Sequence, residues 1–382
     1  MNAAANMMPA RRPLRVLHLR DSPWVDGPGR TILETGSHID AQRVEYHIGA
    51  FASGGKHALV EGAQARGLNV HVIQDRRGIA AELVDRIVEL IDRLQIDVLH
   101  TSEFRSNVLA LLVRRRRPIK LACTAHGWIA NDLRGRVFRA VDKFVLPRFD
   151  VVFLVSQATR NLVPRWWLPD RRVQVLPNAL VLGVYGREIV ETPRPKRDTS
   201  AGATVLNVGR LSPEKGQDLL LRAIAALAPR YPRLKLQFAG IGPLEQELRA
   251  LAASLGIADR VEFLGYIDNM PKLYADIDLV VQSSFTEGMP NVILEAAYLR
   301  VPIVATAVGG TAEVVEHGKG AWLIPPHSLE ALTAGIERYL RDPDGFARMG
   351  DAAHARVCAE FSFDVRTRKL MDVYERLCSV SA

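Results

Sequence analysis

Short apolar runs alternate with amphipathic helical stretches along both halves of the chain. In the first half, strands are predicted at Leu14–Leu19, Tyr46–Phe51, Asn69–Ile73, Asp97–Thr101, Ile119–Thr124, Val151–Ser156 and Val173–Leu176. Helical spacing of apolar residues lies between them, most clearly at Ala80–Leu94 and Ser106–Arg115. A second series of strands is predicted at Thr204–Val208, Lys235–Ala239, Val261–Leu264, Leu279–Gln282, Ile303–Ala305 and Ala321–Ile324. This repeated β–α alternation predicts parallel sheets that are covered by helices on both faces.

The alternation is interrupted at residues 186–203, which contain Pro193, Pro195 and a charged run rich in Ser, Thr and Gly. Such a segment is typical of a linker, and 382 residues are too many for one compact core. We therefore expect a loose tail at 1–13, an N-terminal domain at 14–185, the linker, a second domain at 204–360 and a final segment at 361–382. The fold class is α/β, with two doubly wound domains facing a cleft. Ligands of such domains bind outside the carboxyl ends of the strands.

Composition favours a reduced, cytosolic protein. No stretch approaches the roughly 20 apolar residues of a membrane-spanning helix, and the start of the chain lacks the apolar core of a secretory signal. The three cysteines are few and far apart. Residues 1–180 carry 27 Lys and Arg against 17 Asp and Glu, whereas residues 181–382 carry 23 against 25. The basic first half indicates an anionic partner, namely a phospholipid surface, a lipid-phosphate acceptor or nucleic acid.

Two features of the first half bear on that partner. Arg114–Arg117 end a predicted helix, where cations complement the helix dipole and are commonly solvated. Trp166 and Trp167 suit a membrane interface, and they suit packing against their own domain equally well. A nucleic-acid partner is the weakest reading, because the basic half contains no recognisable nucleic-acid-reading motif.

The segment Glu287–Glu295 is the strongest candidate for chemistry. It follows a predicted strand and leads into a predicted helix at Val292–Tyr298, and seven residues separate its two carboxylates. Gly288 permits a close approach of the backbone, and Pro290 and Asn291 open the helix, whose first amides have no internal acceptor. A helix start of this kind attracts phosphate. Since a carboxylate repels phosphate, Glu295 is better suited to the hydroxyls of a ribose.

A second candidate follows the first strand of the second domain. Arg210 and Lys215 lie five residues apart on the loop Gly209–Gly216. Arginine can contact a diphosphate through two parallel hydrogen bonds, and lysine supplies a compact charge. Lys215 also lies near a helix start, where a cation is disfavoured by the dipole unless it pairs with an anion. The loop is therefore a predicted diphosphate clamp, with solvated surface charge as the alternative.

Three further turns are weaker candidates. Asp26-Gly27-Pro28-Gly29 forms a glycine-bearing strand-to-helix turn without dinucleotide-binding spacing. His126 follows the fifth strand, where it could reach a sugar hydroxyl or serve as a structural cap, and the pair Gly309-Gly310 offers either close ligand approach or a plain turn. Metal-binding spacings such as H-E-x-x-H are absent. The D-x-D at Asp276–Asp278 precedes a strand and is interpreted as a turn, so we expect no metal and no cofactor.

The residues around the two loops resemble glycosyltransferase family 4. Asn207–Gly216 is similar to the phosphate-clamp segment of that family, and Ser283–Ala296 resembles its E-x7-E motif. The match continues through Pro302–Thr306, Gly309-Gly310 and Glu313. The first domain matches more loosely, through the Gly27 turn, His126-Gly127, Ser156 and Pro177-Asn178.

The resemblance implies the GT-B fold, with two Rossmann-like domains and a final helix that crosses back to the first. It implies transfer of a sugar from a UDP- or GDP-linked donor, with retention and without metal, to a sugar or lipid-linked acceptor. The implied donor-site residues comprise Gly27, Gly29, His126, Arg210, Lys215, Tyr266, Ile267, Glu287, Gly288, Met289, Pro290, Asn291 and Glu295. Of these, His126, Arg210, Lys215 and Glu287 would act at the reacting centre.

The chain departs from the family pattern at three places. Asp26-Gly27 stands where a pair of glycines is frequent, and we expect Asp26 either to point away from the phosphate or to serve the acceptor. Asn178 is followed by Ala179 instead of glycine, and Arg300 occupies a helix end where glycine is common. The alternative functions are a nucleotide-sugar epimerase of the same fold and a non-catalytic sugar- or lipid-binding protein. We expect a cytoplasmic protein, with peripheral association at the inner membrane face as a variant of that reading.

Overall fold

The protein forms two compact units that divide the chain discontinuously. The computed structural model describes residues 12–52, 54, 56–75, 81–125, 144–183, 198–200, 202–267 and 269–379. The N-terminal unit comprises Met1–Leu154, Val163–Leu176 and Phe363–Ala382, and the C-terminal unit comprises Val155–Leu162 and Pro177–Ser362. The predicted tail lies mostly, and the predicted linker largely, outside the described residues.

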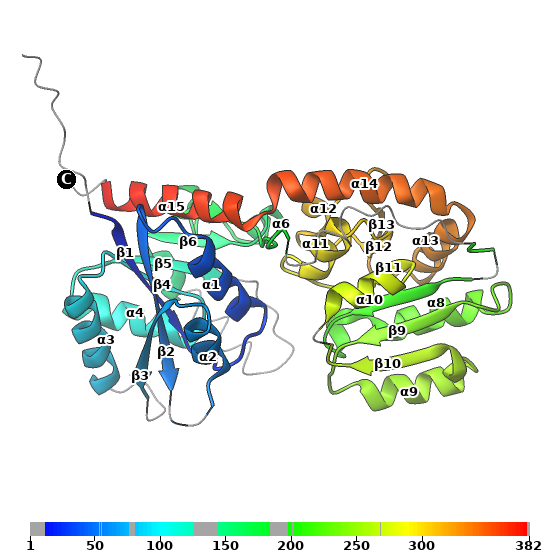
Figure 1. Ribbon diagram of the computed structural model, residues 1–382, viewed down its shortest axis with the longest axis horizontal. Coiled ribbons are helices and arrows are strands. Elements are labelled where there is room, and N and C mark those ends of the chain that lie inside the picture. The colour runs from blue at the N-terminus through cyan, green and yellow to red at the C-terminus, as the bar shows by residue number, and fades with distance from the viewer. Residues whose placement is uncertain are drawn as a thin grey trace, which may run out of the picture. The chain divides into compact units, whose positions relative to one another are not determined.

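The N-terminal unit is built on a seven-stranded parallel sheet with the order β3-β2-β1-β4-β5-β6-β7 (Figure 1). Its strands are β1 (Leu14–Arg20), β2 (Val44–Ala52), β3 (Asn69–Gln74), β4 (Val98–Thr101), β5 (Lys120–Ala125), β6 (Val151–Leu154) and β7 (Val173–Val175). Both faces of this sheet are apolar, as parallel sheets require.

Helices cover the two faces of the N-terminal sheet. One core cluster joins the sheet to α3 (Ala81–Leu94) and α4 (Phe104–Arg116), and it also includes the short helix η1 (Leu146–Arg148). On the other face, a second cluster joins the sheet to α1 (Gly27–His38), α2 (Ala58–Gln64) and the final helix α15 (Phe363–Ser379). A second short helix, η2 (Asp170–Arg172), precedes β7.

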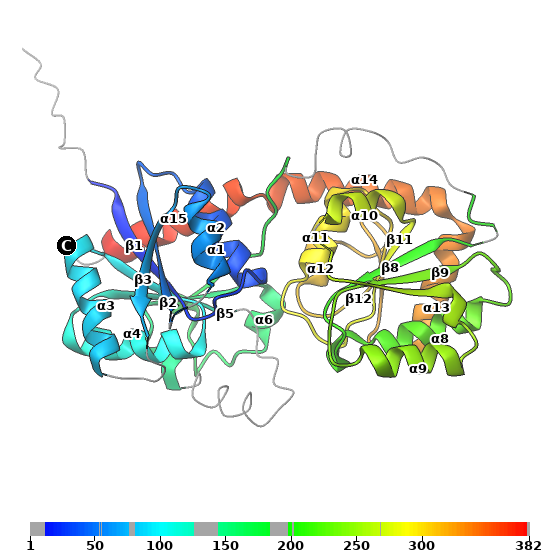
Figure 2. The same cartoon turned by 60° about the horizontal axis from the view of Figure 1, so that its bottom comes forward.

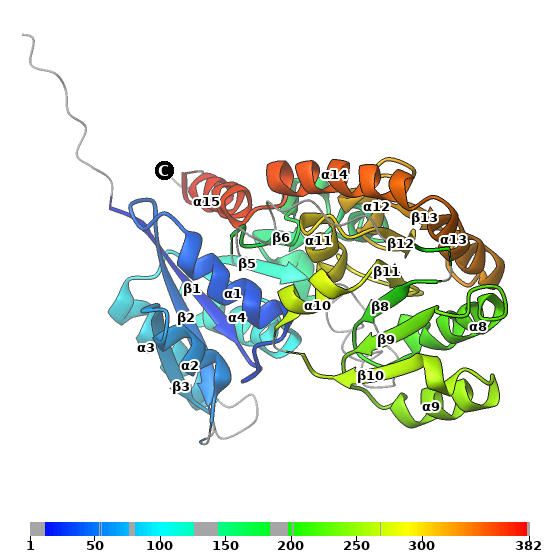
Figure 3. The same cartoon turned by 45° about the vertical axis from the view of Figure 1, so that its right-hand side comes forward.

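The C-terminal unit contains a six-stranded parallel sheet with the order β10-β9-β8-β11-β12-β13, which can be followed in Figure 3. Its strands are β8 (Thr204–Val208), β9 (Lys235–Ala239), β10 (Val261–Gly265), β11 (Leu279–Gln282), β12 (Ile303–Thr306) and β13 (Trp322–Ile324). Two short helices, η3 (Pro213–Lys215) and η4 (Ala258–Arg260), lie between them along the chain.

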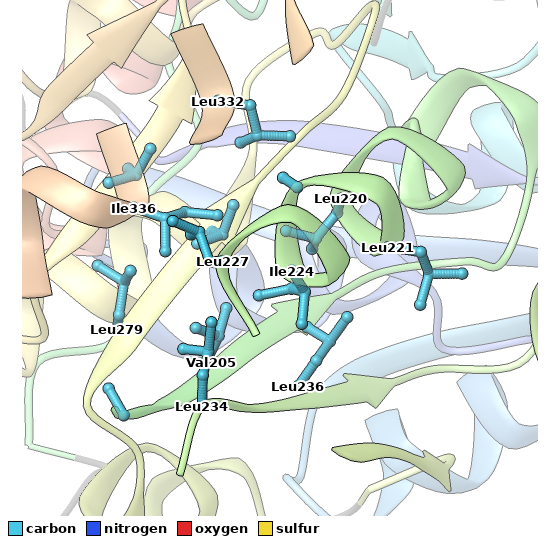
Figure 4. Packing of buried hydrophobic residues seen from close by; sticks show 14 of the residues in the cluster. Val205, Leu220, Leu221, Ile224, Leu227, Leu234, Leu236, Leu279, Leu332 and Ile336 are labelled. Carbon is cyan, nitrogen blue, oxygen red and sulfur yellow. The ribbon is translucent and has the colours of Figure 1, made fainter. Parts of the chain in front are cut away.

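The C-terminal sheet is likewise covered on both faces (Figure 2). One core cluster involves α8 (Gln217–Leu227), α9 (Glu245–Ser254) and α13 (Leu329–Arg341). Figure 4 shows how Leu220, Ile224 and Leu227 of α8 lie among Val205, Leu236 and Ile336 in that cluster. The opposite face carries α10 (Met270–Asp276), α11 (Asn291–Tyr298), α12 (Thr311–Val314) and α14 (Pro343–Glu360).

Each sheet reverses its strand order at one point. In the N-terminal sheet, β1 and β4 are neighbours, and in the C-terminal sheet β8 and β11 are neighbours. The connections leaving two such strands run to opposite sides of the sheet, so their loops diverge and leave room for a ligand at the carboxyl ends. The topology therefore indicates that a ligand site lies at the loops after β1 and β4 or at the loops after β8 and β11.

One short helix of the C-terminal unit lies, in the sequence, between two segments of the N-terminal unit. Helix α6 (Gln157–Asn161) follows β6 directly, yet it belongs to the C-terminal unit. The carboxylate of Glu313 accepts hydrogen bonds from the amides of Gln157, at 2.9 Å, and Ala158, at 2.8 Å. Glu313 thereby supplies acceptors for amides that a helix start leaves without partners.

The predicted elements agree closely with the structure. All thirteen predicted strands are present within two residues at each end, and the helices predicted at Ala80–Leu94 and Ser106–Arg115 correspond to α3 and α4. Strands of three to nine residues, mostly buried and separated by helical spacing, are strong local signals, which explains this agreement. No helix of the described chain combines the length and the hydropathy that crossing a membrane requires.

The structure adds ion pairs to the predicted basic helix end. Three of its four arginines form ion pairs: Arg114 with Asp150, Arg116 with Asp85 and Arg117 with Asp92. The helix end is therefore partly neutralised by its own unit, and its arginines stay at the solvated surface as expected, since the side chains of Arg116 and Arg117 are 43% and 41% exposed.

The two tryptophans divide between the two interpretations that the sequence allows. Trp167 packs against the core of the N-terminal unit, whereas Trp166 is 87% exposed.

The final helix completes one face of the N-terminal core. Leu370, Met371 and Tyr374 of α15 are buried in the cluster that also contains α1 and α2. The Tyr374 hydroxyl lies 2.6 Å from Nδ1 of His100 in β4, and burial raises the pKa of Tyr374 well above its ordinary value. The tyrosine thus joins two segments that are 274 residues apart.

We predict that Tyr374→Ala lowers the free energy of unfolding by about 3–5 kcal/mol, because it leaves a cavity in a closed core. Tyr374→Phe keeps the ring and removes only the hydrogen bond, so it should cost about 1 kcal/mol. Urea titrations followed by circular dichroism would measure both losses. Equal losses for the two variants would contradict the importance of ring packing.

Candidate functional site

An ion pair lies at the point where the strand order of the C-terminal sheet reverses. Nζ of Lys215, on the loop after β8, donates to Oε1 of Glu287, on the loop after β11, at 2.7 Å. The same carboxylate oxygen accepts a hydrogen bond from the hydroxyl of Ser284 at 2.7 Å. The Glu287 side chain is 11% exposed and that of Lys215 is 22% exposed, so the pair is partly shielded from water. The structure thus brings together two residues that the sequence placed 72 positions apart.

The loop after β8 is fixed against the loop after β11 by backbone contacts. The hydroxyl of Ser283 donates to the carbonyl of Lys215 at 2.9 Å, and the amide of Phe285 donates to the carbonyl of Glu214 at 2.8 Å. Gly216 has φ of +60°, and a Cβ there would lie 2.4 Å from the carbonyl oxygen of Ser283. Glycine is therefore required at 216 for both its conformation and its clearance.

A third loop, after β12, supports Glu287 from the other side. A Cβ at Gly309 would lie 2.2 Å from the carbonyl oxygen of Glu287, and Gly309 has φ of +53°. The amide of Gly310 donates to the carbonyl of Gly288 at 2.7 Å. The sequence left these glycines open between ligand approach and a turn. The structure shows that their close approach is to the protein's own backbone.

Helix α11 begins beside the ion pair with no side-chain cap. Pro290 is its N-cap residue and the helix starts at Asn291, as predicted. Asn178 holds this start in place, since its Nδ2 donates to the carbonyl of Met289 at 3.0 Å and to Oδ1 of Asn291 at 3.1 Å. The Met289 side chain is buried in the core, so that residue offers a ligand only its backbone.

Glu295 lies one turn inside α11 and is only 6% exposed. Its Oε2 accepts a hydrogen bond from the hydroxyl of Tyr274 at 2.9 Å, and Tyr274 itself is fully buried. The tyrosine fixes the orientation of the carboxylate. Tyr274 belongs to the core cluster on the face of the sheet that α11 covers.

Arg210 and Tyr266 present exposed side chains at the ends of β8 and β10. No acid pairs with the Arg210 guanidinium within the part of the chain that the structure describes. Tyr266 is 73% exposed and follows Gly265, whose φ is +68°, while Ile267 packs against the core. These positions leave Arg210 and Tyr266 accessible to a bound molecule.

The predicted glycines of the first domain belong to the other unit, the N-terminal one. Gly27 and Gly29 form the first turn of α1 in the N-terminal unit, so the predicted turn is already helix. Asp26 is the N-cap of α1, since its Oδ1 accepts from the amide of Gly29 at 3.0 Å and from Arg20 at 2.6 Å. Capping and pairing therefore fix the Asp26 side chain, and its expected relation to a phosphate or an acceptor stays a prediction. His126 lies outside the described residues.

The D-x-D segment is structural, as the sequence suggested. Helix α10 ends at Asp276 and β11 begins at Leu279. Oδ2 of Asp278 accepts from the amide of Thr204 at 2.7 Å, which ties the start of β11 to β8. Among the described residues there is no group of three or more His, Cys, Asp or Glu that could hold a metal ion.

Three polar residues of the site were not singled out individually from the sequence. Ser284 fixes Glu287, Tyr274 fixes Glu295, and Asn178 fixes the start of α11. Asn178 and Ser284 do belong to segments that resemble glycosyltransferase family 4. Their partners lie across the fold, so local spacing carries no signal for the roles of Asn178 and Tyr274.

The arrangement suits a ligand that carries both phosphate and hydroxyl groups. Two cations and an uncapped helix start supply favourable positions for negative charge. Glu287 and Glu295 are acceptors, and sugar hydroxyls are donors. A nucleoside diphosphate joined to a sugar contains both kinds of group.

Comparisons with known proteins agree with this chemistry. The family model described as Glycosyl transferases group 1 matches residues 191–356, and the model described as Glycosyltransferase Family 4 matches residues 25–182. The chain is 30% identical over 288 residues to a GDP-mannose-dependent alpha-(1-6)-phosphatidylinositol monomannoside mannosyltransferase from Mycobacterium tuberculosis. That match covers 69% of this chain and 72% of the mycobacterial protein.

Two further likenesses extend the comparison. An exopolysaccharide phosphotransferase from Streptomyces coelicolor is 31% identical over 235 residues, but the chain matches only 24% of that protein's length. The crystal structure of the Anabaena protein HepE in complex with UDP has a TM-score of 0.80 and 22% identity. It covers 95% of this chain and 100% of its own, so the whole fold is shared.

We predict that Gly309→Ala destabilises the protein more than Gly318→Ala does. Both glycines have left-handed φ, but a Cβ at Gly318 would meet nothing within 4 Å. The control should cost about 1–2 kcal/mol from backbone strain alone, and Gly309→Ala should add about 1–3 kcal/mol for displacing the Glu287 loop. Thermal unfolding of the two variants would test this, and equal losses would mean that the loop yields without cost.

Proposed function

The chain belongs to glycosyltransferase family 4, a family of retaining nucleotide-sugar enzymes with the GT-B fold, and on that premise we propose its reaction. It moves a sugar from a UDP- or GDP-linked donor to a hydroxyl acceptor in polysaccharide or glycolipid assembly. The observation that carries this proposal is the meeting of Lys215 with Glu287 beside the uncapped start of α11.

The proposed role of Lys215 follows from charge. As the glycosidic bond breaks, negative charge grows on the diphosphate, and preorganised donors stabilise it best. Lys215 is already held in place by Glu287. Arg210 lies on the same loop and its side chain is exposed. The amides at Gly288–Asn291 add donors, so the leaving group meets fixed positive charge from two loops.

The carboxylates serve the neutral parts of the donor. Glu287 accepts hydroxyls of the sugar close to the reacting carbon, and its pairing with Lys215 orients it. Glu295 binds the ribose, and Tyr274 sets the direction of its carboxylate. Tyr266 and Ile267 line the base, and His126 orients the donor sugar.

The proposed chemistry needs no nucleophile from the protein. The bond between the anomeric carbon and the phosphate oxygen breaks, and the acceptor oxygen forms its bond on the same face of the sugar. The acceptor's proton passes to the leaving phosphate. Atoms and charge balance without a covalent enzyme intermediate.

The relatives support the substrate classes. HepE binds UDP, and the mycobacterial relative is described as dependent on GDP-mannose and as acting on a phosphatidylinositol mannoside. By extension from these two relatives, we propose that the present chain uses a nucleoside diphosphate sugar as donor. Its acceptor is then a glycolipid or a growing glycan.

We predict that Lys215→Ala reduces turnover of the donor by about 10²–10³-fold, the usual loss for one preorganised donor. Titration calorimetry with UDP and GDP should show weakened binding for Lys215→Ala and for Glu295→Ala. Lys319→Ala is the matched control, because Lys319 is exposed and pairs with Glu316 at the surface. Unchanged nucleotide affinity in both site variants would remove the basis of the proposed donor site.

A double variant separates two explanations of such a loss. Lys215→Ala alone strands the Glu287 carboxylate, which could disrupt the loop without any role in phosphate binding. In Lys215→Ala/Glu287→Ala that charge is gone, and the proposal expects nucleotide affinity to stay low. Recovery of affinity in the double variant would show that Lys215 serves only to neutralise Glu287.

The epimerase alternative requires no acceptor. Incubating UDP- and GDP-sugars with the enzyme alone should release free nucleotide slowly by hydrolysis and leave the sugar configuration unchanged. Chromatography of the recovered nucleotide sugars would detect an isomerised product, and its appearance would favour the epimerase.

Membrane association remains part of the proposal through Trp166 and Arg115. Trp166 is 87% exposed and Arg115 is exposed, whereas the neighbouring arginines are paired. We predict sedimentation with vesicles containing anionic lipid at low salt, reduced by Trp166→Ala and by added salt. Vesicles of neutral lipid are the control, and no sedimentation at low salt would argue against a charged membrane face.

A further inference from the structure

The carboxyl edge of the N-terminal sheet carries an exposed tryptophan that has no role in the proposed donor site. Trp24 lies in the loop after β1, beside the point where β1 and β4 reverse the strand order. Its side chain is 71% exposed and the next residue, Val25, is 40% exposed. Such a position at the carboxyl ends of parallel strands is where doubly wound domains bind ligands.

The backbone of this loop is fixed although the indole is not covered. The amide of Leu59 in α2 donates to the carbonyl of Pro23 at 3.1 Å, and the amide of Trp24 donates to the hydroxyl of Ser22 at 3.3 Å. A Cβ at Gly29 would lie 2.8 Å from the carbonyl oxygen of Trp24, so α1 also presses against the loop. The loop therefore presents a large apolar surface to water from a held backbone.

Carboxylates outnumber the cations in the ion pairs around this loop, whereas the proposed donor site offers cations to a ligand. Arg20 is almost fully buried and lies between two carboxylates, with Asp26 at 2.6 Å and Glu103 at 2.5 Å. Glu103 also accepts from the amide of Asp21 at 2.6 Å. The guanidinium of Arg20 is thus committed within the protein.

The second arginine at this edge is committed in the same way. Arg105 pairs with Asp21 at 2.7 Å and with Asp75 at 2.8 Å, and its guanidinium lies over the ring of Phe51. The hydrogen bond to Asp75 is the largest cause that raises the pKa of Arg105. These contacts join the ends of β1, β2, β3 and the start of α4.

The two groups together contain four carboxyl groups and two guanidinium groups. Neither of these guanidinium groups is available to a phosphate. The formal balance of the edge stays negative when the exposed Arg30 in the first turn of α1 is counted with the four carboxyl groups, so an incoming phosphate is disfavoured. Carboxylates accept hydrogen bonds from hydroxyls, and Asp26 and Asp21 keep side-chain exposures of 52% and 29%. The edge therefore favours a neutral polyhydroxyl ligand over an anionic one.

Resting on the proposed function, we propose that Trp24 is the platform on which a neutral sugar ring of the acceptor stacks, with its hydroxyls toward Asp21 and Asp26. The apolar C–H face of a pyranose covers the indole, and the acidic cluster rejects phosphorylated sugars. The acceptor moiety bound here is then an uncharged glycosyl unit. Any phosphate of a lipid-linked acceptor lies away from Trp24.

The test uses the full-length protein saturated with UDP or GDP, whichever binds. Saturation-transfer NMR would measure binding of a panel of methyl hexopyranosides and of the matching hexose 6-phosphates. We expect at least one neutral glycoside to bind, and to bind about tenfold more weakly to Trp24→Ala. Trp24→Phe should retain most of the affinity, and Phe144→Ala, which removes another exposed aromatic of the same unit, should retain all of it.

Two salt conditions test the charge argument. Each 6-phosphate should bind more weakly than its neutral partner, and the difference should shrink as salt is added, since screening weakens repulsion. Tighter binding of the phosphates, unchanged binding in Trp24→Ala, or no detectable binding of any neutral glycoside would each overturn the proposal.

The nucleotide titration separates this proposal from the one on which it rests. Trp24→Ala should bind UDP and GDP as the natural protein does, because Trp24 is not a donor contact. If the natural protein binds neither nucleotide, the proposed function fails, whatever the glycosides do. If a nucleotide binds and the glycoside results fail, only the role of Trp24 is lost.

Discussion

The ion pair between Lys215 and Glu287 is the interaction around which the C-terminal site is organised. A lysine beside a carboxylate in a partly shielded position has little freedom, since leaving would strand both charges. Hydrogen bonds from the Ser283 hydroxyl and the Phe285 amide then fix the two loops that carry the pair. The two loops are consequently joined without a ligand, and preorganisation of this kind is what electrostatic stabilisation of a leaving group requires.

The two sheets share the same topology, but the charges at their two reversal points differ in sign. At the reversal point of the C-terminal sheet, a cation, a helix start and an exposed arginine create favourable positions for negative charge. At the reversal point of the N-terminal sheet, Arg20 and Arg105 are each paired with two carboxylates. On the two proposals above, a phosphate-bearing donor binds the C-terminal unit and an uncharged acceptor sugar binds the N-terminal unit, and charge distinguishes the two ligands where the fold does not.

The sequence was sufficient for the strands and for the loops that meet at the C-terminal site, because both depend on local patterns. Apolar runs of β-branched residues define β8 and β11, and glycine and proline mark the loops after them. Long-range partners were beyond such patterns. The capping of α1 by Asp26, the support of Glu287 by Gly309 and the link from Asn178 to α11 each depend on a contact that only the folded chain creates. The pairing of Arg114, Arg116 and Arg117 was missed for the same reason, since charge counting does not reveal which acids lie opposite.

The division of the chain has a consequence for how this enzyme can be recombined. Because Val155–Leu162 and Phe363–Ala382 belong to the unit other than that of their immediate sequence neighbours, the polypeptide passes between units four times. A chimera that exchanges acceptor specificity between relatives cannot be made with one crossover. It must carry α15 together with the first half of the chain, and it must leave α6, capped by Glu313, with the second half. An exchange of one whole unit between relatives therefore needs several crossovers at once, which limits how independently the two units can evolve.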